Sequence, residues 1–324
     1  MKLSLIMPVA NAMPHLRECL DSVQSQTYTD WECLCVDGGS TDGSGVLIDY
    51  YAAYDNRFRA IHHSYNSGAP AARNSGLCCA RGDYVVFVDV ANLLPPQMLE
   101  SAASAIAATD ADIVRLVANG AQHKVQTDFT IRTGRDFFTA NILRSDLTEH
   151  FYRRRCIGTM RFDEQSTANA DMLFHLSMLL TAFSSVQCKC LHGSPPRIAT
   201  YPTASDAIHL VKALGKWYEK ARPLLVRYDA LPLAKERIVR HINKVVMELY
   251  RTAATPERIS KLGKKLSPVL RTFERSANAS LAHGISHGIL HNPLQLSYRH
   301  LIRRGESHPY VLALAAQDLL KEGA

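Results

Sequence analysis

Residues 1–120 contain a series of short apolar segments, each followed by a helix-like segment. Strands that are apolar on both faces must be covered on both faces, and helical connections between them favour parallel pairing. The pattern predicts an α/β fold with a mostly parallel sheet flanked by helices. The expected strands are Leu3–Val9, Trp31–Asp37, Phe58–His62, Asp83–Asp89 and Asp112–Val117. The expected helices are Pro14–Gln26, a segment ending at Tyr54, residues 69–80, and Pro95–Thr109.

Polar turns follow three of these strands. They are Pro8 to Asn11, Asp37 to Ser40, and Asp89 to Asn92. Ligands of open parallel sheets bind outside the carboxyl ends of the strands, where such turns meet. The sequence therefore predicts a binding site at this edge of the sheet.

The rest of the chain divides into two parts. Residues 118–205 are less regular, whereas the pattern from Asp206 onward is helical, over 206–222, 233–251 and 256–275. Residues 206–324 hold 20 Lys and Arg against 10 Asp and Glu, a net charge of +10, and residues 1–205 hold 17 against 20, a net of −3, which together give the total of +7. We expect two domains, 1–205 and a basic helical region over 206–324.

Composition excludes several classes of protein. The hydrophobic fraction of 47% and the charged fraction of 21% are those of a globular protein, and no stretch reaches the roughly 18–20 apolar residues of a membrane span. The apolar start of the chain fits a buried first strand better than a signal peptide. Eight cysteines without a CxxC are expected to be reduced thiols of a cytoplasmic protein, with Cys33 and Cys35 on one face of a strand.

Four blocks in order carry a family resemblance. "LSLIMPVANAMPHLRECLDSVQSQTYTDWECLCVDGGSTDGS", which holds a Pro-x-x-Asn motif and a Gly-Ser-Thr-Asp turn, "NSGAPAARNSGLCCARGDYVVFVD" and "RFDEQSTANADMLFHLSMLL" resemble the corresponding blocks of family 2 glycosyltransferases. The "DVAN" turn stands where that family has an Asp-x-Asp-Asp block. The resemblance covers roughly residues 1–200. It implies a GT-A, Rossmann-like domain of an inverting enzyme that uses a nucleotide sugar as its donor, followed here by the all-helical C-terminal region.

The resemblance also implies roles for particular residues. Asp171 occupies the position of the catalytic base, which deprotonates an acceptor hydroxyl as it attacks the anomeric carbon. The positions expected to bind the nucleotide sugar are Pro8, Asn11, Asp37, Arg73 and Asp89. Arg73 is suited to a diphosphate because its guanidinium is a bidentate donor.

Four positions depart from the family pattern. The aromatic residue expected before Asn11 is Ala10, and the second acid after the second strand, which reads the base, is Gly38. The metal-ligand position is Ala91, and the Glu expected before the base is Ala170.

These departures make a metal site doubtful. Asp89 is the one acid left for Mg²⁺ or Mn²⁺, and Asn92 offers an oxygen without charge. Arg73, or the run Arg153, Arg154 and Arg155, is an electrostatic alternative to the metal.

Each site residue also has a purely structural interpretation. Asp37 could cap the turn that follows it, and Asp89 could bind amides of its own loop. Asp171 could be a first-turn acid of a helix, and Arg73 could be a solvated ion-pair partner. The Arg153–Arg155 run could be an exposed face.

The C-terminal region offers weaker signals. His283, His287 and His291 are spaced by four, which permits metal binding on a helix, although Gly284 and Gly288 disfavour that helix. The basic helices with Trp217, Tyr218, Leu224 and Leu225 could contact anionic lipid headgroups, or pack against another protein surface. No motif indicates a nucleic-acid partner.

Two functions remain open at this stage. The first is transfer of a hexose or aminohexose to a glycan or lipid-linked acceptor in cell-surface polysaccharide assembly, in the cytoplasm or at the inner face of the membrane. The second is a pseudoglycosyltransferase that binds a glycan or a partner enzyme, because Ala10, Gly38, Ala91 and Ala170 all fall at functional positions.

Overall fold

The fold is described from a computed structural model of the chain. The structure describes residues 1–118, 126–132, 147–165, 170–182, 184–190, 204–231 and 234. Contacts divide the chain into two compact units, Met1–Ile198 and Ala199–Ala324, which are described separately.

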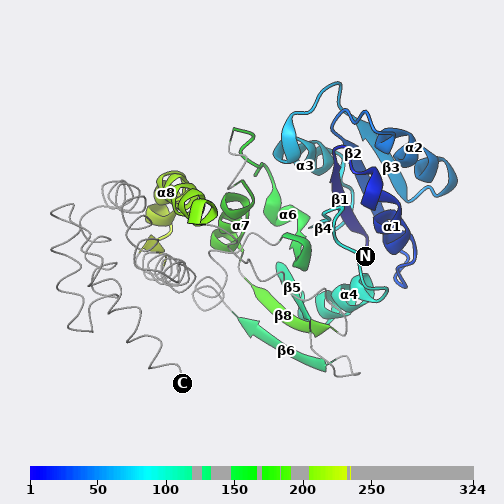
Figure 1. Cartoon of the computed structure of the whole chain (residues 1–324). Helices are drawn as coiled ribbons and strands as arrows, with labels where there is room; N and C mark the ends of the chain where they lie inside the picture. The colour runs from blue at the N-terminus through cyan, green and yellow to red at the C-terminus, as the bar shows by residue number, and fades with distance from the viewer. Residues whose placement is uncertain are drawn as a thin grey trace, which may run out of the picture. The chain divides into compact units, whose positions relative to one another are not determined.

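The first unit is built on one mixed sheet (Figure 1). In the described residues it has eight strands in the order β3-β2-β1-β4-β7-β5-β8-β6. β3, β2, β1 and β4 are parallel neighbours, β5 and β8 are parallel, and β7 and β6 run antiparallel to their neighbours. The strands are β1 (Leu3–Val9), β2 (Trp31–Asp37), β3 (Phe58–His62), β4 (Tyr84–Phe87), β5 (Ile113–Ala118), β6 (Gln126–Arg132), β7 (His150–Arg153) and β8 (Ser185–Cys190).

Helices cover both faces of this sheet (Figure 1). They are α1 (Met13–Gln24), α2 (Ser44–Tyr54), α3 (Gly68–Cys79), α4 (Met98–Thr109), α6 (Arg154–Ile157) and α7 (Ala170–Thr181), with a 3-10 turn η1 at Leu147–Glu149. Apolar residues of α1, α2 and α4 form one buried cluster with one face of β1, β2 and β4. This burial on two faces explains why the central strands are apolar throughout.

The opposite face is covered by α3 and α7. A Cβ added to Gly76 of α3 would lie 2.4 Å from Ile6 Cγ2 of β1, so glycine permits this close approach of helix and strand. On β4, Phe87 makes edge-to-face contacts with Phe174 of α7 and with Phe162, at ring-centroid distances of 5.4 and 5.0 Å. These contacts fix the start of α7 beside the end of β4.

The predicted fold class is confirmed, with one correction to the strand count. β1, β2 and β3 have the predicted bounds, and β4 is shorter than the predicted Asp83–Asp89. Residues 118–205 are more regular than predicted, because β6, β7, α7 and β8 lie within them. β7 inserts between β4 and β5, a long-range antiparallel pairing that leaves no local pattern.

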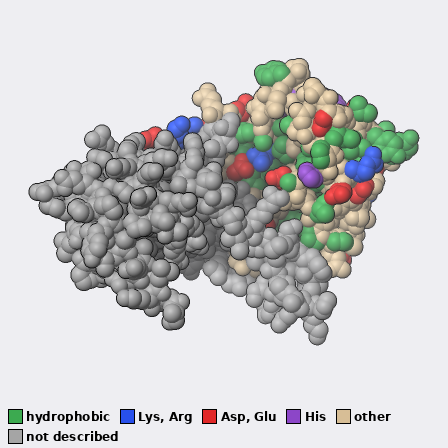
Figure 2. Space-filling model, in the orientation of Figure 1, with side chains coloured by type: hydrophobic (Ala, Val, Ile, Leu, Met, Phe, Trp, Pro, Cys, Tyr) green, Lys and Arg blue, Asp and Glu red, His purple; other side chains and the backbone are tan. Residues whose placement is uncertain are grey.

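Charge is not segregated on the face of the first unit that Figure 2 shows. Over the described part of the face shown in Figure 2, basic and acidic side chains lie interspersed with hydrophobic ones. Of the described cysteine side chains, none forms a disulfide, and Cys33 and Cys35 lie on one strand face with their sulfurs 3.7 Å apart.

The described part of the second unit is α8 (Ala204–Arg227) and the residues just after it. The helix continues past Pro223, where the prediction ended it at Arg222. Of the residues suggested to contact lipid headgroups, Trp217, Tyr218 and Leu225 are fully buried and Leu224 is half-buried. The burial of the first three fits the alternative that they pack against protein. The helices predicted over 233–251 and 256–275, and the three spaced histidines, lie outside the described residues. No helix in the described ranges combines the length and apolarity needed to cross a bilayer.

Candidate functional site

Two of the three predicted turns meet at the carboxyl edge of the sheet. The backbone N–H of Asn11 donates to Ser40 Oγ at 2.9 Å, and the N–H of Thr41 donates to Asn11 Oδ1 at the same distance. Asn11 is in the left-handed region with φ of 47°, a conformation that Asn tolerates better than most residues. Pro8 lies within β1 opposite Val36 of β2. The turns after β1 and β2 are therefore held together by the side chains of Asn11 and Ser40.

Asp37 faces the interior of this turn. It is 4% exposed, its Oδ1 accepts the N–H of Ser40 at 3.0 Å, and its Oδ2 lies 3.3 Å from His62 Nδ1. Burial by itself raises the pKa of Asp37, but the hydrogen bonds from Ser40 and His62 outweigh burial and hold the pKa below its ordinary value. The carboxylate shapes the turn, and direct contact with a donor remains a prediction.

His62 is a part of this arrangement that the sequence analysis did not identify. Its Nε2 lies 2.9 Å from Asp49 Oδ1 on α2, and Asp49 and Asp37 together raise its pKa against the effect of burial. A histidine at the end of a strand carries no signal of its own in a sequence. Its position opposite the β2 turn depends on the pairing of β3 with β2.

Asp89 lies in the turn that follows β4. It is exposed, its Oδ1 accepts the N–H of Ala91 at 3.1 Å, and its carbonyl accepts the N–H of Asn92 at 2.9 Å. The carboxylate therefore accepts a hydrogen bond from its own loop, as its structural interpretation predicts. It is also exposed to solvent.

The residues around Asp89 do not fit a divalent metal of the usual kind. Ala91 has no side-chain oxygen, and Asn92 adds no charge. No group of three or more His, Cys, Asp or Glu suited to a metal occurs in the part of the chain that the structure describes.

Arg73 and Asp171 form the most direct pair of charges at this edge. Arg73 on α3 donates from Nη1 to Asp171 Oδ1 on α7 at 2.6 Å, across 98 residues of sequence. Arg73 Nε is buried and has no hydrogen-bond acceptor among the described residues. Burial raises the pKa of Asp171; the charge of Arg73 lowers it in part, and the charge of Asp89 raises it further.

The pair is held in place by Asn74 and two phenylalanines. Asn74 Nδ2 donates to the carbonyl of Phe162 at 3.0 Å and to Glu164 at 2.8 Å, and its Oδ1 accepts the N–H of Phe162 at 2.8 Å. The Phe162 ring stacks on Phe174 of α7 at a centroid distance of 4.2 Å, and the Arg73 guanidinium lies 5.4 Å from its centroid. Asn74 and Phe162 thus link α3 to α7. No sequence motif indicates this role for Phe162.

The arginine run at 153–155 does not serve as a substitute for a metal at Asp89. Arg153 forms ion pairs with Asp110 and with Asp112, and Arg154 Nε donates to the carbonyl of Gly82 at 2.6 Å. Gly82 precedes β4, so these contacts lie at the amino end of that strand, whereas Asp89 follows its carboxyl end. The suggestion was wrong for Arg153 and Arg154 because an antiparallel strand, β7, delivers them to the opposite edge.

Comparisons with known proteins agree with this architecture. Residues 4–166 match the family model described as Glycosyl transferase family 2. Glycosyltransferase GlyG of Streptococcus pneumoniae is 36% identical over 112 residues, 35% of this chain and 37% of that protein. The uncharacterized glycosyltransferase EpsJ of Bacillus subtilis is 44% identical over 86 residues, 26% of this chain and 25% of that protein. The chain therefore spans well under half the length of either relative.

A further relative is the poly(ribitol-phosphate) beta-glucosyltransferase of Bacillus spizizenii, 43% identical over 93 residues, 28% of this chain and 14% of that protein. Among solved structures, S. aureus TarS 1-349 in complex with UDP-GlcNAc superposes with a TM-score of 0.67 at 17% identity, over 99% of this chain and 92% of that chain. The structural likeness shows a shared fold. The names of these relatives give no support to the alternative of a non-catalytic protein.

Proposed function

Because the chain belongs to glycosyl transferase family 2, we propose that it transfers a sugar from a nucleoside-diphosphate donor to a hydroxyl group of a glycan or lipid-linked acceptor. The observation that carries the proposal is the Arg73–Asp171 pair at the carboxyl edge of the sheet. A partly buried carboxylate beside a guanidinium supplies the two charges that this reaction requires.

Asp171 is the proposed general base. Its raised pKa brings it closer to neutral pH, which makes it a better proton acceptor than an ordinary aspartate. The acceptor oxygen forms a bond to the anomeric carbon while the bond from that carbon to the diphosphate oxygen breaks. The acceptor proton passes to Asp171 Oδ, and the bonding electron pair leaves with the diphosphate. Attack from the face opposite the leaving group inverts the configuration.

Arg73 is the proposed contact for the diphosphate. Its side chain is 15% exposed, and its Nε–H lacks an acceptor within the described ranges, so a donor oxygen would satisfy a buried N–H. Asp89 is near enough to Asp171 for its charge to raise the Asp171 pKa. Because Ala91 and Asn92 do not fit Mg²⁺ or Mn²⁺, no step of the proposed reaction depends on a metal.

The place of the reaction in polysaccharide assembly rests on the relatives. One of them is named as a poly(ribitol-phosphate) beta-glucosyltransferase. Transfer of a hexose or aminohexose at the cytoplasmic face of the membrane is the corresponding proposal for this chain.

The proposal is tested by titrating the full chain with UDP-, GDP- and dTDP-sugars in a calorimeter, with and without Mn²⁺. We expect micromolar binding of at least one donor and little change on adding Mn²⁺. Binding that requires Mn²⁺ would contradict the role given to Arg73. Failure of every donor, in both buffers, would overturn the proposed function.

A further inference from the structure

The turns after β1 and β2 lack the aromatic ring and the carboxylate that are expected to contact the donor base. A Cβ placed on Gly38 would lie 3.8 Å from the Cβ of Ala10, so these two positions are neighbours. Ala10 is exposed and has no aromatic ring, and Gly38 has no carboxylate. Neither residue can hold a flat, partly apolar base.

The loop between β3 and α3 packs directly against Gly38, which is buried, and Gly39. A Cβ on Gly39 would lie 3.2 Å from Tyr65 Cα and 3.3 Å from the carbonyl oxygen of His63. A Cβ on Gly38 would lie 3.5 Å from Asn66 Oδ1. Gly39 also has a φ of +73°, so the turn and the loop approach as closely as they do because residue 39 carries no side chain.

The loop that carries Tyr65 is held on both sides. The N–H of His63 donates to the carbonyl of Asp37 at 2.8 Å, and His63 Nε2 lies 2.9 Å from Ser75 Oγ on α3. Asn66 Oδ1 accepts the N–H of Gly68 at 2.9 Å. The backbone of Tyr65 is therefore positioned before any ligand arrives, which lowers the entropic cost of binding through its ring.

The ring of Tyr65 is not part of the hydrophobic core. Tyr65 is 71% exposed, whereas Tyr51 and Tyr84 are buried. Tyr50 and Tyr54 are also exposed, so exposure alone indicates no site, but both lie on α2 and their rings pack on each other. Tyr65 differs from them because its backbone borders the Gly38–Gly39 turn.

We propose that Tyr65 stacks on the base of the donor nucleotide and supplies, from the β3–α3 loop, the aromatic contact that position 10 lacks. The inference rests on the proposed function and adds to it the residue that contacts the base. Every nucleobase has a π-face, and stacking on an aromatic ring depends little on which base is present. Asn66, adjacent to Tyr65, offers an amide to the edge of the same base.

The test compares Tyr65→Ala with the matched control Tyr54→Ala, which removes an equally exposed tyrosine from α2. The probe is the nucleoside diphosphate that the unaltered chain binds best, measured by calorimetry. Loss of one base–aromatic stack weakens binding by roughly tenfold or more. We expect that loss for Tyr65→Ala, affinity close to the unaltered chain for Tyr65→Phe, and no change for Tyr54→Ala.

Tyr65→Trp gives a second measurement, the fluorescence of the new indole. A purely structural role of residue 65 would not make this fluorescence respond to a nucleotide. Since both native tryptophans are buried, the added exposed indole dominates the accessible emission, and a stacked base should quench it on titration. Quenching at the calorimetric Kd supports the proposal.

Unchanged affinity in Tyr65→Ala, or no quenching in Tyr65→Trp, would overturn the role of Tyr65 and leave the proposed function intact. No nucleotide binding by the unaltered chain would instead overturn the proposed function itself. Circular dichroism of each variant separates loss of binding from loss of the fold.

Discussion

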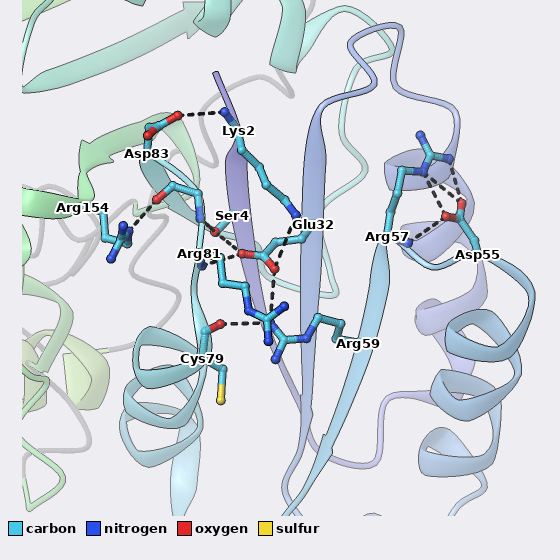
Figure 3. A network of polar contacts seen from close by, with 11 residues as sticks. Lys2, Ser4, Glu32, Asp55, Arg57, Arg59, Cys79, Arg81, Asp83 and Arg154 are labelled. Carbon is cyan, nitrogen blue, oxygen red and sulfur yellow. Dashed lines mark hydrogen bonds and ion pairs between the residues drawn. The ribbon is translucent and has the colours of Figure 1, made fainter.

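Two charged clusters at opposite edges of the β3-β2-β1-β4 sheet, around Glu32 and around Asp171, differ in how their charges are paired. At the amino edge, Glu32 is 2% exposed and lies among several partners (Figure 3). Its Oε1 accepts from Ser4 Oγ at 2.7 Å and from the N–H of Arg81 at 2.6 Å, and its Oε2 lies 3.2 Å from Arg59. Burial alone would raise the pKa of Glu32, but these hydrogen bonds outweigh burial and hold the pKa below its ordinary value.

The cluster of Asp171, Arg73 and Asp89 at the carboxyl edge is less completely paired. Asp171 has a raised pKa, Arg73 keeps a buried N–H without an acceptor in the described ranges, and Asp89 faces solvent. Charges that are fully paired within the protein stabilise the fold, whereas perturbed and incompletely paired charges concentrate at functional sites. The contrast indicates that the amino edge holds the sheet together and that the carboxyl edge is kept for a ligand.

The largest effect that would sharpen this contrast is expected from Asp171→Asn. Loss of a general base lowers the transfer rate by about 100-fold or more. Asn retains an oxygen for the Arg73 N–H, so the free energy of unfolding should change by less than about 1 kcal/mol. The measurements are transfer of labelled sugar under saturating donor, and urea unfolding. A variant that keeps its transfer rate would remove Asp171 from the chemistry.

The next effect is expected at the other edge, from Glu32→Ala. This change leaves the Ser4 hydroxyl and the Arg81 N–H without their acceptor in a buried position, which costs about 2–3 kcal/mol of unfolding free energy. Donor affinity of the folded variant, measured by calorimetry at low temperature, should be unchanged.

Asp30→Ala is the matched control for Glu32→Ala on the same edge. Asp30 pairs with the N-terminus at 3.2 Å, but its side chain is 54% exposed, so its loss should change stability by less than about 1 kcal/mol. Equal losses of unfolding free energy in the two variants would show that the burial of Glu32 does not increase its contribution to stability.

The smallest expected effect concerns how stability depends on pH. The contributions of Asp171 and Glu32 to the free energy of unfolding should change in opposite directions as the pH falls. The folded pKa of Asp171 lies above its unfolded value of about 3.9, so Asp171 stabilises the fold as pH falls from its folded pKa toward that value. The folded pKa of Glu32 lies below its unfolded value of about 4.3, so the stability that Glu32 contributes is lost as pH falls below that value.

Unfolding free energies of the unaltered chain, Asp171→Asn and Glu32→Gln between pH 7 and 3 would show this difference. Stability relative to Asp171→Asn should rise on acidification above about pH 4, and stability relative to Glu32→Gln should fall below it. If both differences in unfolding free energy changed in the same direction with pH, the proposed contrast between Asp171 and Glu32 would be wrong.

Much of the first unit could be predicted because its signals are local. The strands β1, β2 and β3 are continuous apolar runs that end in polar turns, so burial on both faces fixes their bounds without knowledge of the neighbours. The later strands β6, β7 and β8 were missed because their pairing is long-range and partly antiparallel. Arg153 and Arg154 were placed at the wrong edge for the same reason.

Apolar periodicity and motif order are properties of neighbouring residues, so the fold class and the family could be inferred from the sequence alone, as could the sheet edge proposed for the site. Which of the candidate residues lie in contact depends on tertiary packing. Arg73 and Asp171 are 98 residues apart and meet because Asn74, Phe162 and Phe174 join α3 to α7. Tyr65 carries no motif, and its proposed role follows from the approach of its loop to Gly39, a distance that no sequence pattern encodes.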